Sequence, residues 1–114
     1  MANHIKIKPA PGTWSVRAGG AVLGESSRAL ELSEGEMPPV VYFPREDIAM
    51  AFLDESDAST HCPHKGDARY FSVVTKSRTL ENAVWSYENP KDAVAEIKDH
   101  LAFYPIDEVT VEQI

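Results

Sequence analysis

The sequence predicts a mainly β domain of the α+β class, with about seven or eight short, mostly antiparallel strands and two short helices. Three observations support this prediction. The chain has 114 residues, the length of one domain, so we expect a single domain over residues 1–114. Short segments in which apolar and polar residues alternate recur along the chain, which is typical of half-buried strands. The helix-like segments do not alternate regularly with these strands, which argues against a doubly wound parallel sheet.

The first part of the chain is predicted to form short strands joined by glycine and proline turns. Apolar and polar side chains alternate over residues 4–8, 13–17, 21–23 and 28–32. Gly19 and Gly20 lie between two of these segments. Both tolerate a positive φ, so the pair predicts a tight hairpin turn. Residues 33–39 are polar and end in two prolines, which predicts a loop.

The middle of the chain combines a buried strand with a helix and a loop. Residues 40–43 are apolar and β-prone, so we expect a mostly buried strand. Residues 45–53 place three apolar side chains at a spacing of i, i+3 and i+4, which predicts a short helix. Residues 54–61 are small and polar, so we expect a loop there.

The last part of the chain is predicted to contain the second helix and the remaining strands. Asn89 can cap a helix and Pro90 suits its first position, so a helix is expected to begin there. The remaining strands are predicted at residues 69–76, 84–87, 101–104 and 109–111. Together these elements predict a compact β-rich domain.

The net charge of −7 excludes several classes of partner. An acidic protein repels the nucleic-acid backbone, so we expect no nucleic-acid partner. Residues 59–80 are an exception, because they carry four basic side chains and one acidic one. This basic segment either solvates the outer face of a strand or attracts a small anionic ligand.

Several other classes of protein are also excluded. No apolar run approaches the roughly 18 to 20 residues of a membrane span, and we see no secretory signal. We therefore expect a cytoplasmic protein of bacterial type with no membrane partner. The single cysteine rules out a disulfide framework and a multi-cysteine zinc site, so no bound metal is expected. Glycine-rich phosphate loops and the common hydrolase motifs are also missing.

Residues 60–66 concentrate reactive groups in one predicted turn. Three interpretations are open: His61, Cys62 and His64 bind a metal; an imidazole and Lys65 activate Cys62 as a nucleophile; or Cys62 is buried and the turn only aims Lys65. Adjacent residues rarely converge on one ion. Nothing in the sequence fixes a base for the thiol. The third interpretation is therefore favoured.

Aromatic residues form a second group of candidates. They occur mostly as neighbouring pairs at or near predicted strands, and each pair presents one ring to each face of its strand. Half of them are expected in the core, and the other half to line a pocket. The eight residues are Tyr42, Phe43, Tyr70, Phe71, Trp85, Tyr87, Phe103 and Tyr104.

Four ordered motifs resemble a known family. Residues 42–48 are similar to its opening "Y-F-P-x-x-D-V", and residues 60–70 to its core "T-x-C-P-x-K-G-x-A-x-Y". Residues 84–90 resemble its "a-W-x-Y-x-x-P" stretch, and residues 97–104 its closing "I-x-x-h-l-A-F-Y". This is the family of small uncharacterised proteins called domain of unknown function 427, which the chain resembles over about residues 13–111. The resemblance implies an Mss4-like or β-tent architecture without zinc cysteines, and no established activity.

The family is sometimes labelled nucleotidyltransferase-like. Such enzymes hold a metal–triphosphate with two carboxylates placed rigidly after a glycine turn. After Gly19 and Gly20 this chain offers only Glu34 and Glu36, in a predicted loop before two prolines. The residues themselves therefore do not favour nucleotidyl transfer.

We expect a soluble protein that binds a small anionic or planar ligand in a pocket lined by aromatic and basic residues. Arg45 and Lys65 are predicted to point at one site and bind a carboxylate or phosphate. The alternatives are an enzyme that uses Cys62 or Asp47, and an interaction or dimerisation module. The sequence indicates no particular cofactor, and it leaves open a monomer or a homodimer. The candidate binding residues are Tyr42, Arg45, Asp47, Cys62, Lys65, Tyr70, Trp85 and Tyr87.

Overall fold

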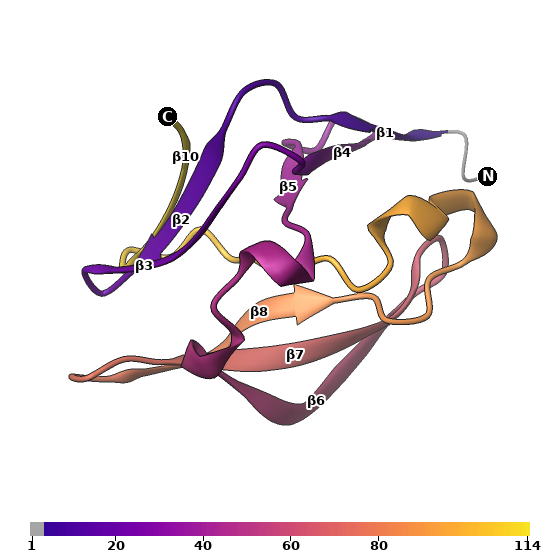
Figure 1. Ribbon diagram of the computed structural model, residues 1–114. Helices are drawn as coiled ribbons and strands as arrows, with labels where there is room; N and C mark the ends of the chain where they lie inside the picture. The colour runs from indigo at the N-terminus through magenta and orange to yellow at the C-terminus, as the bar shows by residue number, and fades with distance from the viewer. Residues whose placement is uncertain (1–3) are drawn as a thin grey trace.

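The computed structural model describes residues 4–114 and contains ten strands in three antiparallel sheets (Figure 1). The mainly β, antiparallel class predicted from the sequence is confirmed. The strand count is slightly higher than predicted. In Figure 1, one sheet lies at the upper right, one at the left, and one along the bottom of the molecule.

The first sheet has the strand order β1-β4-β5. It consists of β1 (Ile5–Pro9), β4 (Leu30–Glu34) and β5 (Val40–Tyr42). The side chain of Leu32 is buried, as the alternating pattern predicts. A short loop between β4 and β5 carries the two prolines predicted to end it.

The second sheet has the order β10-β2-β3, with β2 (Trp14–Ala18), β3 (Ala21–Ser26) and β10 (Val109–Gln113). The predicted hairpin turn between β2 and β3 is confirmed, because Gly19 and Gly20 have φ values of 55° and 87°. The strand β10 returns from far along the chain to pair with β2.

The third sheet has the order β6-β7-β8-β9. Its strands are β6 (Leu53–Cys62), β7 (Gly66–Val74), β8 (Thr79–Ser86) and β9 (Ala102–Phe103). Residues 63–65 form the predicted turn between β6 and β7. Gly66 closes this turn opposite Cys62, with a φ of 115°.

The prediction of a loop over residues 54–61 is wrong, because these residues belong to β6. This strand lies at the edge of its sheet, and most of its side chains are exposed, so it needs no alternating apolar pattern. A bulge between Glu55 and Ser59 interrupts its pairing with β7. Backbone hydrogen bonds to β7, rather than side-chain burial, hold it in the sheet.

The prediction of a helix over residues 45–53 is also wrong. Two short 3-10 turns, η2 (Arg45–Asp47) and η3 (Met50–Phe52), take its place. Between them Ile48 is extended and pairs with Gly24 in an isolated bridge. The helix predicted to begin at Asn89 is replaced by the 3-10 segment η4 (Asp92–Ile97), which follows Lys91 without a side-chain cap and is kinked at Val94. Segments this short do not form a stable α-helix without tertiary support.

Two clusters of buried side chains connect the three sheets. The first cluster joins the second sheet to the third, and includes Val16, Leu23, Phe43, Val73, Val84 and Leu101. The other joins the first sheet to the third, and includes Leu32, Tyr42, Tyr70, Tyr87, Val94 and Ile97. Phe43 and Leu101 also exchange two backbone hydrogen bonds of 2.8 Å, which tie the chain just after β5 to the start of β9.

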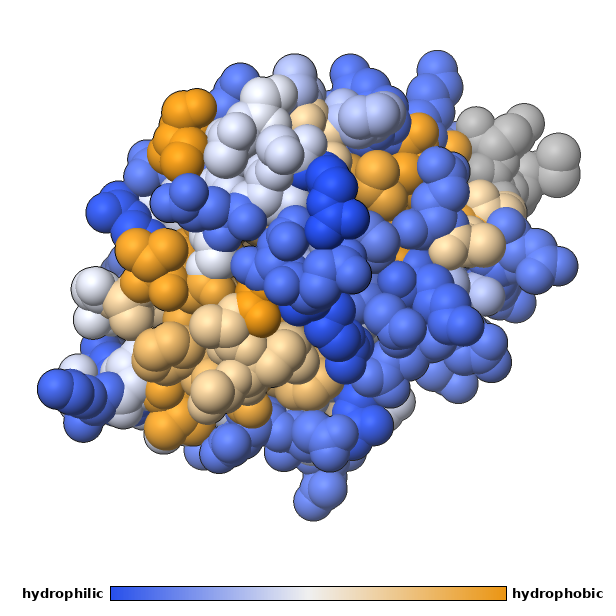
Figure 2. All heavy atoms as spheres, in the orientation of Figure 1, coloured by the Kyte–Doolittle hydropathy of each residue, from blue (hydrophilic) through white to orange (hydrophobic). Residues whose placement is uncertain are grey.

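The surface is mostly polar. Figure 2 shows one face, on which apolar side chains gather at the lower left, between β3 and η3, while hydrophilic side chains cover most of the rest. Within residues 4–114, no helix is long and apolar enough to span a bilayer.

Candidate functional site

Aromatic side chains surround a cavity of about 250 Å³ between the first and third sheets, which we call the tyrosine pocket. Register explains their convergence, because Tyr70 on β7 pairs directly with Trp85 on β8, and direct partners share a face. Tyr87 follows two residues after Trp85 and faces the same way. The pocket is lined by Leu32, Glu34, Met37, Pro38, Val40, Tyr42, Lys65, Tyr70, Trp85, Tyr87 and Tyr104.

The rings of the tyrosine pocket contact one another in defined geometries. The centroids of Trp85 and Tyr104 are 4.5 Å apart with tilted planes, and Tyr70 stacks against Tyr104 at 6.4 Å. The indole Nε1 of Trp85 donates a hydrogen bond of 3.1 Å to the hydroxyl of Tyr42. The Tyr70 hydroxyl lies 2.9 Å from Oγ1 of Thr60. These contacts fix the rings that form the walls.

Tyr87 differs from the other tyrosines in its hydrogen bonding. Its side chain is buried, yet the structure shows no hydrogen bond from its hydroxyl among residues 4–114. Burial raises the pKa of Tyr87, and it raises the pKa of Tyr42 to about 12. Both phenols therefore stay protonated at neutral pH. The Tyr87 hydroxyl is available as a donor to a bound molecule.

One ion pair supplies the charge in the tyrosine pocket. The ammonium of Lys65 donates a hydrogen bond of 2.7 Å to Oε1 of Glu34, and the two side chains are only 14% and 20% exposed. The Lys65 ammonium also lies 5.9 Å from the centroid of the Tyr87 ring. The hydrogen bond from Lys65 lowers the pKa of Glu34. The pair is therefore ionised and internally neutral at neutral pH.

Glu34 was not among the residues predicted to line the pocket, because residues 33–39 were predicted to form a loop. The sequence nevertheless contains a signal for its position. Glu34 follows Leu32 by two residues, so the two side chains share one face if the strand extends to Glu34. Tyr104, Met37 and Pro38 also line the pocket, and of these only Tyr104 was among the candidate aromatic residues.

Arg45 does not line the tyrosine pocket. Its Nε donates to the carbonyl of Asp99 at 3.0 Å, and its Nη2 donates to Ser86 and Glu88 at 3.1 Å each. The guanidinium thus joins η2 to the chain on either side of η4. Lys65 pairs with a different carboxylate, Glu34. The structure therefore does not bring the two predicted cations to one anion site.

Asp47 also lies outside the pocket. It accepts a hydrogen bond of 2.6 Å from the Ser26 hydroxyl and pairs with Arg28 at 3.3 Å. These contacts link η2 to the chain after β3. Asp47 therefore holds two segments of the fold together, and it does not face the pocket.

Cys62 is half-buried and packs against the second core cluster without lining the tyrosine pocket. The two neighbouring imidazoles have other partners, since His61 contacts Asp67 at 2.7 Å and the His64 ring packs edge-on against His4 at 4.6 Å. Among the described residues, no three His, Cys, Asp or Glu side chains converge as metal ligands would. The placement of Cys62 agrees with a packing role.

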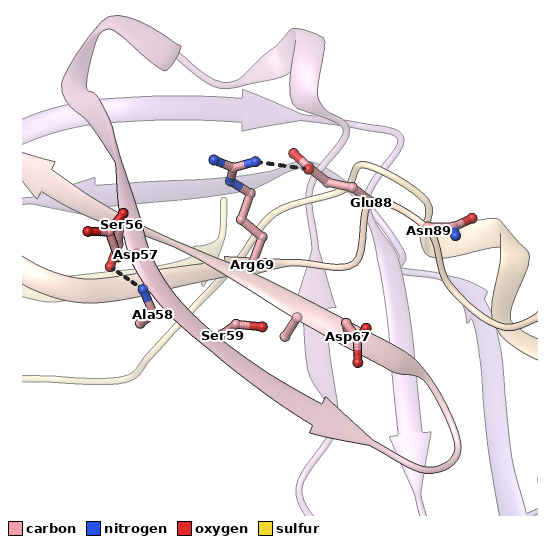
Figure 3. A pocket seen from close by; sticks show the side chains of 9 residues that line it. Ser56, Asp57, Ala58, Ser59, Asp67, Arg69, Glu88 and Asn89 are labelled. Atoms are coloured by element: carbon pink, nitrogen blue, oxygen red, sulfur yellow. Dashed lines mark hydrogen bonds and ion pairs between the residues drawn. The ribbon is translucent and has the colours of Figure 1, made fainter.

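A polar hollow of about 420 Å³ lies beside the bulge of β6. Figure 3 shows Arg69 reaching toward Glu88 there, with Ser56, Asp57, Ser59 and Asn89 around it. The guanidinium of Arg69 pairs with Glu55 at 2.9 Å and with Glu88 at 3.5 Å. Because these carboxylates neutralise the cation and the walls carry few apolar groups, this hollow is a weaker candidate than the tyrosine pocket.

A family described as a domain of unknown function (DUF427) matches residues 6–113. The match agrees with the four motifs noted in the sequence. No curated protein matches the chain.

Proposed function

Because the chain belongs to the family described as domain of unknown function DUF427, whose description names no activity, we propose a function from the geometry of the tyrosine pocket. The protein binds a small planar molecule that carries a hydrogen-bonding group. The observation that carries this proposal is the Tyr87 hydroxyl, which has no protein partner among residues 4–114 and belongs to a pocket walled by aromatic rings.

The walls favour a planar ring. Trp85, Tyr70 and Tyr104 offer ring faces and edges, and an aromatic contact contributes about 0.5–1.5 kcal/mol beyond the area that it buries. The cavity of about 250 Å³ is near the lower end of small-molecule sites, which suits a single ring or a fused pair.

The ion pair favours a neutral polar group over an anion. Glu34 already neutralises the Lys65 ammonium at 2.7 Å, so an anionic ligand would meet an ion pair with no net positive charge. A phenol or carbonyl needs no such charge, because it can accept from Tyr87 and contact the pair from outside. Of the two ligand classes expected from the sequence, anionic and planar, the tyrosine pocket therefore favours the planar one.

Binding of methyl para-hydroxybenzoate tests the proposal. In a Trp14→Phe variant, Trp85 is the single tryptophan, so its fluorescence reports the tyrosine pocket. We expect saturable quenching by the ester. The ring-saturated analogue, with the same substituents on a puckered ring, is expected to bind at least ~10-fold more weakly because it loses the ring contacts. Equal affinities, or no binding of the planar ester, would contradict the proposal.

Tyr87→Phe tests the hydroxyl alone, because it keeps the ring. We expect it to weaken methyl para-hydroxybenzoate binding by about 3- to 10-fold, the contribution of one neutral hydrogen bond. Thr75→Val is the matched control, because it removes a hydroxyl from the turn between β7 and β8, outside the pocket. An unchanged affinity in Tyr87→Phe would remove the Tyr87 hydroxyl from the proposal.

Other expectations from the sequence stay predictions of the same kind. These are the Mss4-like architecture, the bacterial origin, the cytoplasmic location, the lack of nucleic-acid and membrane partners, and the state of monomer or homodimer. Light scattering on the purified protein measures the last of these directly.

A further inference from the structure

A larger hollow adjoins the tyrosine pocket, and we call it the apolar groove. Its volume is about 700 Å³. It shares five lining residues with the tyrosine pocket, namely Met37, Pro38, Val40, Trp85 and Tyr104. The two spaces are therefore neighbours on either side of a common wall, in which Trp85 and Tyr104 are the largest side chains.

The apolar groove lies where the two core clusters approach the surface. Trp14, Val41 and Val111 are partly buried residues packed against the first cluster. On the opposite side, Val40 and Trp85 pack against the other cluster. Between them the side chain of Met37 is 65% exposed, although it is apolar. The groove therefore brings apolar side chains of both clusters to the surface.

The groove contains little charge. Glu31 is the single carboxylate in its lining, and Lys8 pairs with it at 3.4 Å. Among the described residues that line the groove there is no Lys, Arg or His. The groove thus has no fixed cation for a phosphate or carboxylate, and its chemistry matches a hydrocarbon.

We propose that the ligand is a planar ring substituted with an apolar chain, with the ring in the tyrosine pocket and the chain in the apolar groove. The inference rests on the proposed function and names the ligand class for the same site. The shared wall carries it, because a chain attached to a ring in the tyrosine pocket needs only to pass over Trp85 and Tyr104 to reach the groove. The apolar groove would then bury the chain rather than hold water.

A series of para-hydroxybenzoate esters tests the inference, from methyl through propyl and butyl to hexyl. Each methylene that leaves water should tighten binding about threefold to fourfold until the groove is filled. An affinity that stays constant across the series would overturn the inference. If the methyl ester still binds more tightly than its ring-saturated analogue, the proposed function stands even though the inference about the apolar groove fails.

Val111→Thr tests the position of the chain. The substitution keeps the β-branched shape on β10 and adds a hydroxyl to the groove wall. We expect weaker binding of the hexyl ester by about threefold or more and unchanged binding of the methyl ester. Val22→Thr is the matched control, because Val22 is 52% exposed on β3 and lines neither space. Equal losses for both esters in Val111→Thr would contradict the proposed position.

Two further outcomes separate the proposals. If the hexyl ester and its ring-saturated analogue bind equally well, the planar-ring function is overturned and the inference falls with it. The protein could instead form a dimer that is weakened by Val111→Thr but is not dissociated by the hexyl ester. In that case the groove is covered by a second copy of the chain. That result would overturn the inference. The proposed function of the tyrosine pocket would still be tested by binding of the methyl ester.

Discussion

Glu34 connects the tyrosine pocket to the stability of the protein. Its folded pKa lies below the ordinary value of 4.5 because Lys65 donates a hydrogen bond to it, and His4 contacts its other oxygen at 3.5 Å. The ion pair therefore stabilises the fold above pH 4.5, and this contribution is lost as the pH falls through the folded pKa. We expect Glu34→Gln to lower the free energy of unfolding by about 1–2 kcal/mol at neutral pH.

The difference between the parent and Glu34→Gln should shrink toward zero in acid, because Glu34 is then protonated in both states. Urea unfolding at neutral pH and at successive pH values below 4.5 measures it. Glu36→Gln is the control, since Glu36 is exposed in the loop that follows β4. A Glu34→Gln deficit that is the same at every pH would show that the charge of Glu34 is irrelevant to folding.

Cys62 is expected to act as a packing residue. Its side chain is half-buried against the second core cluster, and buried thiols react slowly. We expect Cys62→Ala to cost about 1 kcal/mol in the free energy of unfolding and to leave methyl para-hydroxybenzoate binding unchanged. We also expect iodoacetamide to alkylate Cys62 at neutral pH no faster than it alkylates glutathione. Much faster alkylation would restore the interpretation of Cys62 as a nucleophile.

Individual residues of the site were partly predictable from the sequence. Strand periodicity placed aromatic rings at the right positions, so five of the eight candidates line the pocket: Tyr42, Lys65, Tyr70, Trp85 and Tyr87. Arg45, Asp47 and Cys62 do not line the pocket, and the partners of Arg45 and Asp47 are distant in sequence. Arg45 bonds to Asp99, which lies 54 residues away. Local patterns contain no information about such contacts.

Gly24 joins β3 to the segment that contains η2. A Cβ atom at this position would collide with the backbone oxygen of Asp47 and lie 2.8 Å from Cδ1 of Ile48. We expect Gly24→Ala to lower the free energy of unfolding by about 3 kcal/mol, because the bridge between Gly24 and Ile48 would have to open.

Gly20→Ala is the control for this prediction. Gly20 has a φ of 87°, and a Cβ atom there would meet no atom within 4 Å beyond the adjacent residues, so its substitution should cost only about 1 kcal/mol through backbone strain. Urea denaturation compares the two variants. A Gly24→Ala protein as stable as Gly20→Ala would show that β3 and η2 separate easily.

Most elements were predictable where side-chain burial determines them. The alternating segments form β1 to β4, and the other predicted strands form β5 and β7 to β10. The strand β6 was missed because its pairing depends on the neighbouring β7, and its own residues are exposed and polar. The helix over residues 45–53 was mispredicted because Ile48 pairs with Gly24, a contact that helical spacing does not reveal.

The whole molecule is expected to unfold as one unit, because each core cluster takes side chains from two sheets. Trp14 reports the second sheet and Trp85 the third, so Trp85→Phe and Trp14→Phe each leave one reporter. In each variant, the urea midpoint by fluorescence should equal the midpoint by circular dichroism. Midpoints that differ within one variant would show that the sheets unfold separately and would contradict a single domain.

The pairing of β10 with β2 also determines when the protein can fold in the cell. Arg17 on β2 forms an ion pair with Glu112 on β10, 95 residues later in the chain. The second sheet therefore stays incomplete on the ribosome until residue 113 has been synthesised and has emerged. The hairpin of β2 and β3 and the hairpins of β6, β7 and β8 need only local contacts, and all of them emerge before β10. Among the paired strands, β2 therefore waits longest for one of its partners.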